Sequence, residues 1–90
     1  MVIGDDCRIQ AGVSIGEEGY GWGRSESGIL TRQIHKAAVV IQDHVEIGSN
    51  SVVDLGVFEK TTIHSGAKID NLVHVGHQAT IGRHTLVNQR

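Results

Sequence analysis

The chain of 90 residues has no proline, a single cysteine and only three aromatic side chains. Because Cys7 has no second cysteine to pair with, a disulfide scaffold within one chain is excluded and a reducing compartment is expected. No apolar run approaches the roughly 18–20 residues of a membrane-spanning helix, and no basic segment followed by an apolar one opens the sequence. We therefore expect a cytoplasmic protein with no membrane span.

Charge of one sign is also scarce, since 8 Lys and Arg stand against 10 Asp and Glu. The basic residues are scattered along the chain, which argues against a nucleic-acid partner. With few aromatics and only four Leu, apolar burial falls to Ile and Val, which together number 21. β-Branched side chains favour strands and the twelve Gly favour turns, so the composition predicts many short strands.

Ile or Val recurs at every sixth position in three stretches of the chain. Eleven residues follow this spacing: Ile3, Ile9, Ile15, Ile41, Ile47, Val53, Ile63, Ile69, Val75, Ile81 and Val87. A helix repeats near 3.6 residues and a strand at 2, so a period of six indicates a short strand plus a turn. Three such units form a coil of about 18 residues, and stacking the coils buries the aliphatic positions. The period predicts an all-β fold, a parallel β-helix of about four coils, as a single domain over residues 1–90.

Two insertions interrupt the repeat. The six-residue spacing stops after Ile15 and resumes at Ile41, across a Gly- and Ser-rich segment at 20–38. A second, smaller insertion adds about four residues at 57–60. Insertions in such stacks lie outside the core and often line the working surface. We expect a long loop at 20–38 and a bulge from one corner at 57–60.

Six histidines are the main candidates for chemistry. We interpret His35, His44 and His84 as solvated turn residues and His64 as a structural one. The remaining two, His74 and His77, stand three residues apart in the run Asn71-Leu72-Val73-His74-Val75-Gly76-His77-Gln78. Their context differs from that of the other four histidines, and imidazole exchanges a proton near neutral pH, so these two are kept as candidates.

The segment 68–82 resembles the active-site segment of the UDP-3-O-acylglucosamine N-acyltransferases and of related hexapeptide-repeat sugar acyltransferases. Segments 13–22 and 45–54 also resemble that family, in the same order and at the same separations. The resemblance implies the left-handed form of the parallel β-helix. Gln78 stands where the family usually has Asn or Asp, and Leu55 where it often has Arg.

The resemblance also implies a reaction and a set of site residues. In the family, the residue matching His77 is the general base that removes a proton from a sugar amine as it attacks an acyl thioester. Asp70 is the second catalytic candidate, and Asn71 and His74 are candidates for binding substrate. The implied donor is an acyl-carrier protein or acyl-CoA, the acceptor is a UDP-sugar, and no bound cofactor or metal is expected.

The same resemblance implies a homotrimer with sites between subunits, and Trp22 is a candidate interface anchor. The unpaired coil edge of an open stack also allows trimers to stack end to end. A first alternative is a truncated, inactive β-helix that serves as an oligomerising or binding module, because the sequence lacks the flanking domains of the family. A second is a metal-dependent hydratase, since some hexapeptide prisms bind zinc between subunits. The His-x4-His spacing of those hydratases is absent, although the separation of three positions from His74 to His77 is a possible ligand spacing.

Overall fold

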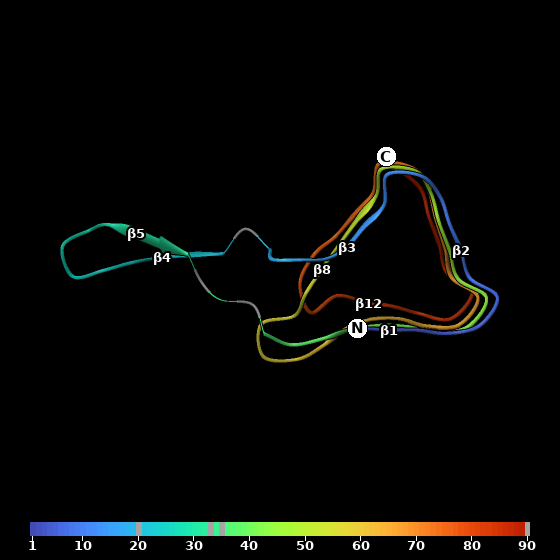
Figure 1. Ribbon diagram of the computed structural model, residues 1–90, viewed down its shortest axis with the longest axis horizontal. Helices are drawn as coiled ribbons and strands as arrows, with labels where there is room; N and C mark the ends of the chain where they lie inside the picture. Colours follow the sequence, from blue (N-terminus) through green and yellow to red (C-terminus); the bar gives the residue numbers. More distant parts are fainter. Residues whose placement is uncertain (20, 33, 35, 90) are drawn as a thin grey trace.

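A computed structural model describes residues 1–19, 21–32, 34 and 36–89. Thirteen short strands and no helix are found among these residues. The strands follow one another around a three-sided coil, and successive coils stack on each other, so the body has a triangular outline (Figure 1). In the described part of the chain, no helix is present that is long and apolar enough to cross a membrane.

Each side of the triangle is a parallel sheet whose strands come from successive coils, four strands in the first two sheets and three in the third. The first sheet contains β1 (Val2–Ile3), β6 (Val39–Ile41), β9 (Thr61–Ile63) and β12 (Thr80–Ile81). The second contains β2 (Arg8–Ile9), β7 (Glu46–Ile47), β10 (Lys68–Ile69) and β13 (Leu86–Val87). The third contains β3 (Ser14–Glu17), β8 (Val52–Asp54) and β11 (His74–Val75). This arrangement confirms the left-handed parallel β-helix of about four coils that the sequence predicts.

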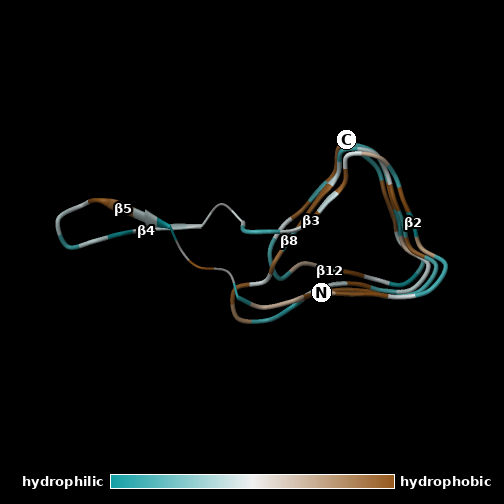
Figure 2. Ribbon diagram, in the orientation of Figure 1, coloured by the Kyte–Doolittle hydropathy of each residue, from teal (hydrophilic) through white to brown (hydrophobic). Residues whose placement is uncertain are grey.

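The six-residue period becomes three vertical columns of side chains. The first sheet aligns Ile3, Ile41, Ile63 and Ile81. The second aligns Ile9, Ile47, Ile69 and Val87, and the third aligns Ile15, Val53 and Val75. All eleven predicted positions therefore meet in register, and those of the two middle coils are buried. Figure 2 shows this division, with hydrophobic residues along the strands and hydrophilic ones at the right-hand corner.

Three corners join the sheets. The first corner lies between the first and second sheets (residues 4–7, 42–45, 64–67 and 82–85). The second corner lies between the second and third sheets (10–13, 48–51 and 70–73). The third corner leads into the next coil and carries both insertions (18–19, 21–32, 34, 36–38, 55–60 and 76–79). Polar side chains tie these turns together from coil to coil; for example, Asp43 Oδ1 accepts a 2.7 Å hydrogen bond from the backbone N–H of Asp5.

The segment predicted to be a loop contains an antiparallel hairpin, made of β4 (Trp22–Arg24) and β5 (Leu30–Arg32). Its turn includes Gly28 at φ 84°, a conformation that glycine adopts without steric cost. The guanidinium of Arg32 lies 4.7 Å from the centre of the Trp22 ring, and Trp22 remains 41% exposed. The hairpin projects from the third corner, away from the stack (Figure 1). Tyr20, in the segment expected to be a loop, and His35, expected to be a solvated turn residue, lie outside the described residues.

The aliphatic columns lead to a stability prediction. Ile47 is 0% exposed in the second coil, whereas its register partner Ile9 in the first coil is 39% exposed. Replacement of Ile47 by Ala should lower the free energy of unfolding by about 2–5 kcal/mol, because it leaves a cavity in a close-packed interior. The matched control Ile9→Ala should cost clearly less in the same denaturant titration. Equal losses at the two positions would contradict this assignment of the core.

Candidate active site

The site residues predicted from the sequence lie on and around β11. Asp70 and Asn71 are in the second corner just before it, His74 is in the strand itself, and His77 is in the third corner just after it. The structure therefore brings His74 and His77 into one strand–turn segment. Asp70 and His77 lie at opposite ends of β11 and are not brought together within one chain.

Asp70 and Asn71 both stabilise the turns around them. Asp70 Oδ1 accepts a 2.8 Å hydrogen bond from the Asn71 N–H, and its Oδ2 accepts one of 3.2 Å from the Gln89 N–H in the next coil. Asn71 Oδ1 accepts a 2.7 Å bond from the Ser49 N–H in the preceding coil. The two side chains remain exposed, so they can contact a ligand while they hold three coils in register.

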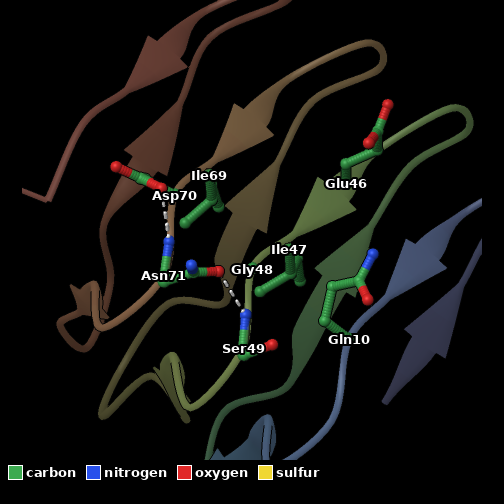
Figure 3. A pocket seen from close by; sticks show the side chains of 8 residues that line it. All are labelled: Gln10, Glu46, Ile47, Gly48, Ser49, Ile69, Asp70 and Asn71. Carbon is green, nitrogen blue, oxygen red and sulfur yellow. Dashed lines mark hydrogen bonds between the residues drawn. The ribbon is translucent and has the colours of Figure 1, made fainter.

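A polar hollow of about 390 Å³ lies beside these two residues, on the outside of the second sheet and second corner (Figure 3). Its side chains include Gln10, Glu46, Ser49, Asp70 and Asn71. At Gly48 a side chain would collide with the Asn71 amide oxygen, so glycine is required for this close packing of coils. The hollow offers carboxylate and amide groups, which suit a ligand rich in hydroxyl or amino groups.

His74 contacts a carboxylate that is not among the site residues predicted from the sequence. Its Nε2 lies 2.6 Å from Oδ2 of Asp54, the last residue of β8. The Asp54 side chain is 4% exposed and the His74 side chain 62%. The pair thus joins a buried carboxylate to an imidazole that faces solvent.

His77 is exposed in a turn whose shape depends on its neighbour Gln78. Gln78 Oε1 accepts hydrogen bonds from the N–H groups of Val57 (3.2 Å) and Phe58 (3.1 Å), in the smaller insertion. The Gln78 N–H donates a 2.9 Å bond to Thr61 Oγ1. The amide side chain of Gln78 therefore connects the turn that carries His77 to the bulge at 57–60.

Other histidines gather at the first corner, away from β11. His44 Nδ1 lies 4.0 Å from Asp6 Oδ2, and the ring of His84 packs against Gly66. His64 occupies the turn between them in the chain. Over residues 1–19, 21–32, 34 and 36–89, the structure has no group of three or more His, Cys, Asp or Glu side chains arranged to hold a metal ion.

The fold and the strand–turn segment of β11 define a class: the chain is a parallel β-helix of hexapeptide repeats, with the exposed histidines His74 and His77 on one strand and the turn that follows it. Within that class, its sequence is similar to proteins named UDP-3-O-acylglucosamine N-acyltransferase. The protein from Sinorhizobium fredii is 43% identical over 83 residues, which cover 92% of this chain and 23% of the relative. No family model matches the sequence.

Two further relatives carry the same name. The protein from Wolinella succinogenes is 42% identical over 85 residues, covering 94% of this chain and 27% of the relative. The protein from Helicobacter hepaticus is 47% identical over 77 residues, which cover 86% of this chain and 24% of the relative. These matches confirm the resemblance found in segment 68–82 and its neighbours. The chain spans about a quarter of the length of the relatives that it matches.

The structural role of Asn71 can be measured. Replacement of Asn71 by Ala should lower the free energy of unfolding by about 1 kcal/mol, because the Ser49 N–H loses its acceptor. Asn88→Ala is the control: Asn88 is exposed near the same corner in the next coil, and its side chain makes no hydrogen bond to the described residues. Thermal unfolding compares the two variants. If Asn71→Ala lowers the stability no more than Asn88→Ala does, the hydrogen bond between Ser49 and Asn71 contributes nothing to the free energy of unfolding.

Proposed function

We propose that the protein is an acyltransferase that moves an acyl group from a carrier or CoA thioester to the amine of a UDP-amino sugar. The observation that carries this proposal is the similarity to UDP-3-O-acylglucosamine N-acyltransferases over 86–96% of the chain, which includes the segment of His74 and His77. The exposure of His77 in its turn supports the same proposal, because a general base must reach its substrate.

In the proposed reaction His77 is the general base. Its imidazole takes a proton from the sugar amine while the amine nitrogen forms a bond to the thioester carbonyl carbon. The C–S bond then breaks, the amide is formed, and the thiolate receives the proton from the imidazolium. The acyl group and the transferred proton come from the two substrates and pass to the amide and the released thiol, so the step balances with His77 as the proton carrier.

The remaining site residues would bind and orient the acceptor. Asp70 and Asn71 border the polar hollow of the second corner, where their oxygens can accept hydrogen bonds from sugar hydroxyl or amino groups. His74 lies on β11 between that corner and His77. We assign Asp70 to the reaction through acceptor orientation, and Asn71 and His74 to substrate binding.

Assembly as a homotrimer would allow one subunit's His77 to face a neighbour's Asp70, which one chain alone keeps at the far end of β11. A cytoplasmic location fits the lone cysteine of the sequence and the proposed acyl-carrier or CoA donor.

The reaction is tested with purified protein, an acyl-carrier or CoA thioester and a UDP-amino sugar. His77→Ala should reduce kcat by about 10²–10⁴-fold, because the general base is lost. His84→Ala is the matched control, since His84 is exposed at the first corner and should leave turnover unchanged. Turnover that survives His77→Ala would remove His77 from the mechanism. If the unaltered protein neither turns over nor binds the UDP-amino sugar, the result would favour the first alternative. In that alternative the chain is an inactive β-helix that serves as an oligomerising module or binds some other partner.

A further inference from the structure

The contact between Asp54 and His74 joins two consecutive coils on the third sheet. His74 is aligned with Val52 of the neighbouring strand, and Asp54 lies two residues further along that strand. Because side chains alternate between the two faces of a strand, Asp54 and Val52 point to the same side as His74. The diagonal offset lets the imidazole reach the carboxylate, and the Nε2–Oδ2 distance is 2.6 Å.

The burial of Asp54 bears on which of the two atoms donates the hydrogen bond. A carboxylate that is 4% exposed requires a partner, because its charge is removed from water. When Asp54 is ionised its carboxylate can only accept hydrogen bonds, and Nε2 of His74 is then the donor in this contact. In the neutral ring the other nitrogen, Nδ1, then has no hydrogen and acts as an acceptor.

Nδ1 is available to a ligand. The His74 side chain is 62% exposed, and its hydrogen bond to the described residues is made through Nε2. His77 follows three residues later in the same strand–turn segment, at the proposed site of proton transfer. An acceptor atom at Nδ1 would therefore belong to the same strand–turn segment as the proposed general base.

We propose that Asp54 is a positioning residue: it fixes His74 in the Nε2-protonated tautomer, so that Nδ1 accepts a hydrogen bond from a hydroxyl or amino group of the UDP-amino sugar. The inference rests on the proposed function for the identity of the ligand. Its first part, the tautomer set by Asp54, concerns this chain alone and is measured without turnover.

The first test is the tautomer of His74, read from the ring nitrogens in a long-range ¹H–¹⁵N NMR correlation of the ¹⁵N-labelled protein. With the ring neutral, the expected pattern is a protonated Nε2 and a bare Nδ1. Asp54→Asn should change this pattern, because the amide can also donate to Nε2 and so move the ring proton to Nδ1. Asp43→Asn is the control, since Asp43 is an exposed turn carboxylate at the first corner.

A His74 ring protonated at Nδ1 in the unaltered protein would overturn the proposal. So would an Asp54→Asn spectrum in which the His74 tautomer is unchanged. If Asp54→Asn fails to fold, Asp54→Glu provides the second variant. It keeps an acceptor-only carboxylate and should retain the Nε2-protonated ring.

The second test adds UDP-3-O-acylglucosamine to the unaltered protein and to Asp54→Asn. A hydrogen bond to Nδ1 should shift the His74 Nδ1 resonance in the unaltered protein and leave the His84 ring unchanged. In the acyl-transfer assay, Asp54→Asn should raise KM for the acceptor about tenfold and change kcat little. Saturation with the sugar nucleotide and no shift at Nδ1 would contradict the role of His74, whatever the turnover. If the expected tautomer and the shift of the Nδ1 resonance are both observed but no turnover is found, the result would instead count against acyl transfer.

Discussion

The in-register stacking of coils is the constraint on which the rest of the structure depends. Backbone N–H groups of one coil donate to carbonyls of the neighbouring coils, for example Glu46 to Ala67 at 3.1 Å and Val52 to Val73 at 2.9 Å. The same register places Ile and Val of successive coils directly above one another. A slip of one residue would turn these side chains outward, so burial and hydrogen bonding specify the same alignment.

The candidate site is a consequence of that alignment. Because inward positions are occupied by small or aliphatic residues, polar side chains lie at the corners and on the outer faces, where they repeat from coil to coil. The Asn71 side chain accepts a hydrogen bond from the coil before it, and the Asp70 side chain accepts one from the coil after it. Asp54 and His74 meet because β8 and β11 are neighbours in the third sheet. The groups proposed to bind substrate therefore also hold the coils together.

The period of Ile and Val was sufficient to predict the strands, the columns and the number of coils, because a repeated local pattern has few ways to bury its apolar side chains. The hairpin of β4 and β5 was not predicted, since the segment has no such periodicity and its pairing depends on a turn around Gly28. The Asp54–His74 contact was also missed. It joins residues 20 apart across the insertion at 57–60, so the sequence spacing does not show their proximity. His77 and Asp70 were found through family resemblance, and their roles stay predictions.

Amide hydrogen exchange of the unaltered protein tests the central claim, that stacked coils in register form the stable core. The N–H groups of Gln42, Glu46, Gly48 and Val52, which donate from the second coil to the third, should exchange slowest. Those of the exposed hairpin, from Trp22 to Arg32, should exchange much faster. Fast exchange throughout the second coil, or strongest protection in the hairpin, would contradict the account.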